Sequence, residues 1–406
     1  MRNVWNRIAW TFGRGAGIWT RNLTLLAVAV FVNRFGQGLF GGARTNFFVN
    51  TLGITGGQVL ALEGIREIPG LALMFIAAFT MRLPLSRRAS VSVAIMGVGY
   101  ALFALVHSYA ALLAVAVTAS LGMHMWMPLN STLVMSLSQK EKTGRTMGTL
   151  NSVGALASLV GMGALVLIAL LFRDLPLRVY YVTGGVFVVI AAALLWRIPP
   201  RVGETEQEQP RLLIKKRYWL YYVLTFFQGS RKEVLNSFGT LVLVDAFDFQ
   251  VWQISALLFV SSIANLVTGP YLGALIDRFG ERKTVAASYV VLILGCLGFV
   301  FIGNPWLLVM VLIVIRLAAM LEMGVSMYVH KIAPSEELTP TLSAGISINH
   351  VTSVIMPLVA SALMPKIGYE GIFMMTAGLI VLSLPFALAL RTAPPTVLQP
   401  KIAGAD

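Results

Sequence analysis

Long apolar stretches alternate with short clusters of charged, glycine and proline residues along almost the whole chain. Six stretches fall in the first half of the sequence, at 21–45, 56–81, 89–107, 109–136, 146–172 and 178–196. Six more fall in the second half, at 218–245, 250–276, 284–302, 305–330, 341–363 and 369–391. Because about 20 apolar residues cross a bilayer as a helix, the pattern predicts an all-α integral membrane protein with twelve transmembrane helices in two pseudo-symmetric six-helix halves.

The polar segments between these stretches define the expected domains. Residues 1–20 carry Trp5, Ile8 and Phe12 among arginines, which is typical of an amphipathic segment at the membrane surface. We expect six-helix bundles at 21–196 and 218–391, joined by a cytoplasmic linker at 197–217 and followed by a tail at 392–406. No cleavage site follows residue 20 and the first apolar stretch is long enough to span, so no signal peptide is predicted.

The composition excludes several classes of protein. Hydrophobic residues make up 57% of the chain and charged residues 12%, against about 25% charged in an ordinary soluble domain. With a mean hydropathy of +0.79, this composition argues against a soluble enzyme. The single cysteine, Cys296, rules out a disulfide framework and a cage of thiolates around a metal. We therefore expect no cofactor and no resident metal, and the absence of a Gly-x-x-x-x-Gly-Lys loop argues against direct ATP drive.

The net charge of +14 would suggest a nucleic-acid partner in a soluble protein, but here it follows the predicted topology. If the N-terminus is cytoplasmic, 22 of the 31 Lys and Arg residues fall in cytoplasmic segments, four on the opposite side and five within spans. An excess of positive charge marks cytoplasmic loops. We expect a multi-pass protein of a prokaryotic cytoplasmic (inner) membrane with both termini in the cytoplasm and no nucleic-acid partner.

A weak internal repeat points to a transporter. A shift of 195 residues places Gln58-Val59 over Gln253-Ile254, and parallel six-span halves of this kind bind their substrate between the halves near the midplane. The loop after the eighth stretch reads Gly-Ala-Leu-Ile-Asp-Arg-Phe-Gly-Glu-Arg-Lys over 273–283. It resembles the signature loop of the major facilitator superfamily.

This resemblance implies the fold of that superfamily and secondary transport of a small molecule by alternating access, in a monomer. It also implies that the loop controls the conformational change. The candidate gating residues are Gly273, Asp277, Arg278, Gly280, Arg282 and Lys283. The counterpart loop at 82–88 lacks the acid and the second glycine, and the Gly-Pro pair typical of antiporters is missing from the fifth stretch.

Ionisable residues inside the apolar stretches are the main functional candidates, since each is costly unless it faces water or a partner. In the superfamily, helices 1, 4, 7 and 10 line the central cavity. The resemblance and the positions together give the candidate substrate-binding residues Arg34, Gln37, His124, Arg231 and Arg316. The carboxylates that are candidates for proton coupling are Glu63, Glu67, Glu233 and Glu322.

Helical spacing adds two local expectations. Arg34, Gln37, Gly38 and Gly41 share one face of the first helix, where the glycines serve either close approach of a ligand or tight helix packing. Glu63 and Arg66 stand three residues apart, so that they can form an ion pair on the second helix. That cluster is either self-neutralised or a site of proton coupling.

The arginine excess on the cavity helices favours transport of a small organic or phosphorylated anion, because arginine binds carboxylate and phosphate in a bidentate manner. Proton coupling is expected, with the lipid bilayer as the surroundings. Three alternatives stay open. The first is transport of a soft metal such as Cu(I), which the side chains of Met123, His124, Met125 and Met127 would suit. The second is export of a hydrophobic drug. The third is a scaffold or receptor that does not transport.

Overall fold

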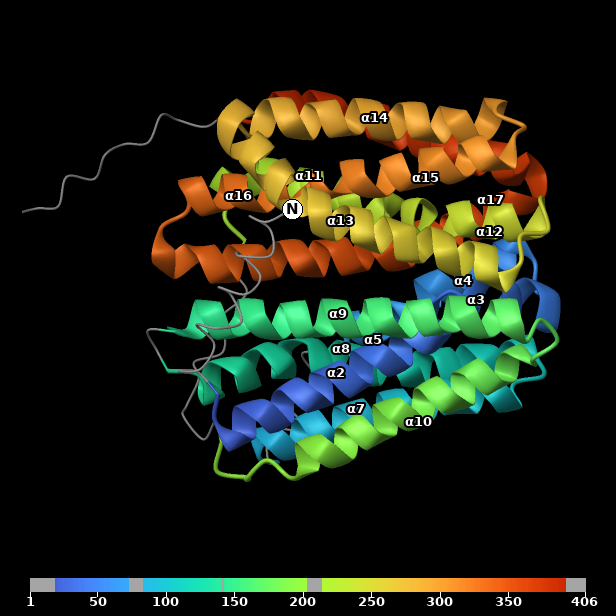
Figure 1. Ribbon diagram of the computed structural model, residues 1–406. Helices are drawn as coiled ribbons and strands as arrows, with labels where there is room; N and C mark the ends of the chain where they lie inside the picture. Colours follow the sequence, from blue (N-terminus) through green and yellow to red (C-terminus); the bar gives the residue numbers. More distant parts are fainter. Residues whose placement is uncertain (1–18, 73–82, 140–141, 203–213, 392–406) are drawn as a thin grey trace, which may run out of the picture. The chain divides into compact units, whose positions relative to one another are not determined.

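The computed structural model describes residues 19–72, 83–139, 142–202 and 214–391, and every regular element within them is a helix (Figure 1). The predicted amphipathic segment up to residue 18, most of the linker and the tail at 392–406 lie outside the described residues. The all-helical expectation is thus confirmed for the part of the chain that can be seen.

The first half of the sequence forms a series of long helices separated by short breaks. In chain order the elements are α2 (Arg21–Gly41), α3 (Arg44–Asn46), the π-helix η2 (Phe47–Thr51), α4 (Gly56–Arg66), α5 (Ile68–Leu71), α7 (Leu85–Leu102), the 3-10 helix η3 (Phe103–Leu105), α8 (Tyr109–Leu137), α9 (Thr143–Leu171) and α10 (Leu177–Trp196).

The second half follows the same plan with two broken helices. Its elements are η5 (Lys216–Tyr218), α11 (Trp219–Glu233), the π-helix η6 (Val234–Phe238), α12 (Gly239–Asp245), α13 (Val251–Phe279), α14 (Glu281–Phe301), α15 (Pro305–Met320), α16 (Met323–Ile332) and α17 (Ser335–Leu388). Within α17, Gly368 has φ 66° and ψ −169°, a conformation that glycine adopts without a steric penalty and that interrupts the helix there.

Local sequence signals explain where several of these helices begin. The side chain of Thr20 accepts a hydrogen bond from the Leu23 amide at the start of α2, and Thr55 and Gln58 form a reciprocal capping box at the start of α4. Asn304 caps α15, whose first residue is a proline. These side chains satisfy amide groups that have no partner within the helix.

Nine helices among the described residues are long and apolar enough to cross a membrane. They match the predicted stretches closely, as at 178–196 for α10. The predicted span at 341–363 lies within α17, and the span at 369–391 begins in α17 after Gly368 and runs three residues past its end at Leu388. The predicted span at 56–81 runs into residues outside the described ranges, and the span at 218–245 is divided into α11, η6 and α12.

Contacts between residues divide the chain into two compact units. The first unit comprises Met1–Gln207, Thr240–Ile263 and Pro357–Pro365, and the second comprises Glu208–Gly239, Ala264–Met356 and Lys366–Asp406. In the first unit, α2 packs against both α9 and α10, while α7 packs against α8 and α10. Leu26, Ala89, Met96 and Val188 lie in the core between these helices, with no more than 1% of each exposed.

Candidate functional site

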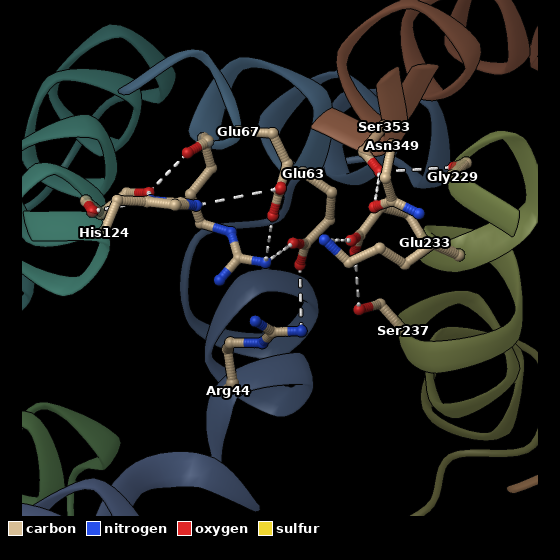
Figure 2. A network of polar contacts seen from close by, with 12 residues as sticks. Arg44, Glu63, Glu67, His124, Gly229, Glu233, Ser237, Asn349 and Ser353 are labelled. Atoms are coloured by element: carbon tan, nitrogen blue, oxygen red, sulfur yellow. Dashed lines mark hydrogen bonds and ion pairs between the residues drawn. The ribbon is translucent and has the colours of Figure 1, made fainter. Parts of the chain in front are cut away.

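An ion cluster in the first unit is built around Glu63, which is only 1% exposed. Its carboxylate lies 2.6 Å from the Arg66 guanidinium, one turn along α4, and 3.0 Å from the guanidinium of Arg44 on α3 (Figure 2). The predicted pairing of Glu63 with Arg66 is confirmed. Arg44, near the end of the predicted stretch 21–45, is the partner that sequence spacing could not indicate.

Glu67 and His124 form the second part of this cluster. The Glu67 carboxylate lies 3.9 Å from His124 Nε2, and both side chains are buried (Figure 2). On its other side, His124 Nδ1 lies 2.9 Å from the carbonyl oxygen of Ser120 and 3.0 Å from its hydroxyl. A carbonyl accepts a hydrogen bond and never donates one, so Nδ1 carries hydrogen and Nε2 of the neutral ring is an acceptor that faces a carboxylate.

The geometry between Glu67 and His124 therefore suits a proton. When Nε2 of His124 and the Glu67 carboxylate both lack a proton, two hydrogen-bond acceptors face each other. A single added proton, on either the imidazole or the carboxyl group, turns this opposition into an attraction. Arg66 lies 4.0 Å from Glu67 and keeps a positive charge beside the pair.

Arg34 and Gln37 lie on α2, as predicted. Arg34 is exposed, and it forms no ion pair or hydrogen bond with another described residue. Beside its stem lies Gly154 of α9, where an added Cβ would come within 3.4 Å of Arg34 Cγ. The Gln37 amide donates a hydrogen bond of 2.9 Å to Asn33 Oδ1, which orients Gln37 along the helix.

The glycines of α2 make close helix contacts. A Cβ at Gly38 would lie 2.7 Å from the Ser158 carbonyl oxygen and 3.0 Å from Gly161 Cα of α9, whereas a Cβ at Gly41 would meet nothing within 4 Å. Gly38 thus serves helix packing, one of the two roles that the sequence left open.

In the second unit, Arg231 is buried and fully engaged. Its guanidinium lies 2.5 Å from the Glu322 carboxylate, donates a hydrogen bond of 3.3 Å to Ser383 Oγ and stands 4.3 Å from the centre of the Tyr289 ring. Only 1% of Arg231 is exposed, compared with 18% of the Glu322 side chain. The sequence singled out both residues but did not pair them, because 91 residues separate them.

Glu322 lies at a break in a membrane-spanning helix. Helix α15 ends at Met320 and α16 begins at Met323, and the Gln228 amide donates a hydrogen bond of 3.3 Å to the Glu322 carbonyl oxygen. Backbone groups freed by such a break need partners inside the membrane, and α11 supplies one of them here.

The remaining intramembrane candidates have separate surroundings within the same unit. Glu233 is 3% exposed, with its carboxylate 3.6 Å from Lys232 Nζ and 3.5 Å from Ser237 Oγ (Figure 2). Arg316 donates a hydrogen bond of 2.9 Å to the carbonyl oxygen of Asn236. Within the second unit, Arg231 and Arg316 therefore contact different groups.

The loop over 273–283 shows one residue that the sequence interpretation left out. In the structure this segment forms the end of α13 and the start of α14, with Gly280 between the two helices. The side chains of Asp277, Arg278, Arg282 and Lys283 are exposed. Glu281 between them is fully buried, at the first residue of α14, and Lys331 Nζ lies 2.5 Å from its carboxylate. Gly280, with φ 79°, allows the sharp turn before it. The signal was an acid at a helix start, where the helix dipole favours negative charge.

Comparison with known proteins finds one family model that matches nearly the full length of the chain. The model of the Major Facilitator Superfamily matches residues 26–231 and 221–405. The chain is 23% identical over 280 residues to multidrug resistance protein MdtG of Citrobacter koseri, covering 63% of this chain and 66% of the relative. It is 26% identical over 142 residues to MdtG of Enterobacter lignolyticus, covering 34% of each.

Solved structures show the same fold. The nucleoside transporter NupG superposes with a TM-score of 0.74 at 15% identity, over 92% of this chain and all of that one. A bacterial homolog of the human lysosomal transporter Spinster, in an inward-facing and occupied conformation, superposes with a TM-score of 0.70 at 16% identity, over 92% of this chain and 96% of the other.

Proposed function

Since the chain belongs to the major facilitator superfamily and is an integral protein of the inner membrane, we propose that it is a secondary transporter of a small organic or phosphorylated anion, driven by protons. Members of this family carry small molecules through the membrane by alternating access, and its relatives are transporters rather than enzymes. The substrate class and the coupling ion are inferred from the charges inside the spans.

One observation carries the choice of an anion. Most cations in the spans have an ionic partner. Arg231 pairs with Glu322, and Lys232 pairs with Glu233. Arg44 and Arg66 lie beside Glu63 and Glu67. Arg34 is exposed at mid-helix without an ionic partner among the described residues. A guanidinium at this depth is costly unless it faces water or an anion, and it binds carboxylate or phosphate through two parallel hydrogen bonds.

Glu67 and His124 support the proposal of proton coupling. Glu63 lies between two arginines, whereas Glu67 faces the imidazole of His124, a group that can accept a proton. Of the four candidate carboxylates, we propose Glu67 as the proton carrier.

Uptake into proteoliposomes tests the anion proposal. Labelled carboxylates and sugar phosphates are supplied with and without an inward proton gradient, and we expect accumulation that the gradient increases. Arg34→Gln should lower uptake by roughly tenfold or more, because a hydrogen bond to a charged group contributes about 1.5–3 kcal/mol. Arg145→Gln, which removes an exposed arginine at the start of α9, is the matched control and should transport like wild type. Unchanged anion uptake by Arg34→Gln would contradict the proposal.

The coupling residue is tested in the same vesicles. Glu67→Gln should abolish the increase caused by the proton gradient while leaving exchange of labelled for unlabelled anion intact. Glu370→Gln removes an exposed carboxylate of α17 and serves as the control. Gradient-driven accumulation that survives in Glu67→Gln would show that another group carries the proton.

Export of hydrophobic compounds is the second candidate, favoured by the name of the MdtG relatives and by an apolar cavity. This cavity of about 250 Å³ lies between α11 and the first part of α17, where Phe226, Ile348 and Val351 line it. Ethidium, a hydrophobic cation, distinguishes the two candidates. Proton-dependent ethidium efflux that is unaffected by Arg34→Gln, together with no anion uptake, would favour drug export. The copper interpretation rests on His124 and the methionines beside it, of which Met125 is buried and Met127 is 58% exposed.

A further inference from the structure

An apolar groove runs along the first unit between α9 and α10, with α2 as its floor. Figure 1 shows α2 between these two helices. The groove holds a cavity of about 280 Å³. Its lining includes Phe35, Leu39, Ala164, Ile168, Val179 and Phe187. The lining holds two hydroxyl groups. That of Thr183 donates a hydrogen bond of 2.8 Å to the Val179 carbonyl oxygen of its own helix, and the other belongs to Tyr180, a residue only 3% exposed.

A second, larger cavity lies beside the first one, at the end of these helices. This cavity has a volume of about 410 Å³ and shares Leu175 and Tyr180 with the first one. Three residues change its character, because Arg173, Gln250 and Trp252 also line it. An apolar cavity therefore adjoins a pocket with a cation, an amide and an indole N–H, all of which donate hydrogen bonds.

Arg173 is available to a ligand. It is exposed, and it forms no ion pair or hydrogen bond with another described residue. The nearby Arg178 is engaged elsewhere, since its guanidinium donates a hydrogen bond to the Ala104 carbonyl oxygen and lies over the Phe47 ring. Asp174 follows Arg173 in the chain but is not part of the lining, so the pocket presents a net positive charge.

We propose that these two cavities form a binding site for an anionic phospholipid, such as phosphatidylglycerol, in the leaflet at this end of α9 and α10. The phosphate binds Arg173, with Gln250 and Trp252 as further donors, and an acyl chain occupies the groove. The match rests on charge complementarity at one end and apolar lining at the other. It also rests on position, because helices that cross a bilayer present such a groove to lipid. The proposal is independent of the transported substrate.

Native mass spectrometry of the full chain in detergent, titrated with phosphatidylglycerol or phosphatidylcholine of the same acyl composition, measures the preference. We expect about fivefold tighter binding of the first phosphatidylglycerol, the ratio that corresponds to roughly 1 kcal/mol for one cation near an anionic headgroup. Arg173→Gln should abolish this preference. Arg145→Gln, at the opposite end of the same helix, should keep the preference for phosphatidylglycerol. If both variants lose this preference equally, it reflects general electrostatic attraction and the proposal is overturned.

Two further variants locate the lipid. Ala164→Trp fills the groove and should weaken binding of both lipids, while unchanged binding would show that the acyl chain lies elsewhere. Phosphatidylglycerol brominated in its acyl chains should quench protein fluorescence more than brominated phosphatidylcholine does, and Trp252→Phe should remove that difference. A difference that persists in Trp252→Phe would overturn the assignment. Glycerol 1-phosphate is tested last, as a competitor of phosphatidylglycerol. If it displaces the lipid when present at the same concentration, the site binds soluble phosphates instead.

Discussion

Glu63 shows how a single buried charge shapes the first unit. It stands between Arg44 and Arg66, whose side chains are 31% and 23% exposed, while its own is 2% exposed. Glu63→Gln leaves two arginines beside a neutral group. We expect this change to destabilise the protein by about 3 kcal/mol, the lower end for breaking a buried ion pair, because the arginines retain some contact with water. Thermal unfolding in detergent measures the loss, and Glu370→Gln, an exposed change, should leave the transition unmoved.

Glu337 shows the same chemistry outside the membrane. Lys215 lies 2.8 Å from its carboxylate, Tyr218 donates a hydrogen bond of 2.9 Å to it, and Arg217 forms a further ion pair. These partners lower the pKa of Glu337 from 4.5 to about 2, and the hydrogen bond from Lys215 has the largest effect. A carboxyl group with a lowered pKa contributes stability above its unfolded value and loses it as the pH falls through its folded value.

The pH dependence of unfolding tests this tie between the start of α11 and the start of α17. Glu337→Gln should lower the unfolding temperature at pH 7 and pH 5. The difference from wild type should shrink as the pH falls from about 4.5 towards 2. A difference that stays constant down to pH 2 would show that the carboxylate charge is not what holds the two segments together.

Sequence reasoning paired residues of this kind only when the two partners were close in the chain. The pair Glu63 and Arg66 follows from helical spacing, whereas Arg231 and Glu322 meet only because α11 packs beside the break between α15 and α16. Both residues were named as candidates, since an ionisable group in an apolar stretch is conspicuous. Their pairing depends on tertiary packing, which no spacing encodes.

At the scale of elements, helix packing in the first unit depends on backbone contact. Gly38→Ala would place a Cβ 2.7 Å from the Ser158 carbonyl oxygen, so α2 and α9 must separate. We expect a loss of about 1–3 kcal/mol from overpacking. Gly41→Ala, at the end of the same helix, meets nothing within 4 Å and should be neutral or slightly stabilising. Unfolding temperatures of the two variants measure the contrast, and equal effects would contradict the packing role of Gly38.

The extent of the helices was largely predictable, because charges, glycine and proline bound the apolar stretches. The predicted stretch at 146–172 corresponds to α9 at Thr143–Leu171. Breaks inside a stretch were not predictable. The stretch at 305–330 contains no proline beyond its first residue, yet the helix breaks at Leu321 and Glu322, where Glu322 turns towards Arg231. Such a break is decided by a partner on another helix.

At the scale of the whole molecule, the distribution of positive charge still predicts an orientation. Cys296 is the single cysteine of the sequence and is fully buried. The wild-type protein should therefore not react with a membrane-impermeant maleimide. In intact cells, Asp174→Cys should react and Arg145→Cys should not, because the first lies in the predicted outer loop after α9 and the second at its cytoplasmic start. Inverted vesicles should reverse the result. Labelling of Arg145→Cys in intact cells would invert the predicted topology.

The close contacts around α2 have a thermodynamic consequence for Arg34. A Cβ at Gly36 would lie 2.5 Å from the Gly184 carbonyl oxygen of α10, so α2 is held between α10 on one side and α9 on the other by backbone contact. The Cα of Arg34 cannot shift without moving both neighbours. A ligand that binds its guanidinium therefore freezes only the rotations of one side chain, and little binding energy is lost to ordering the backbone. Preorganisation of this kind would raise the affinity for the anion that we propose to bind at Arg34.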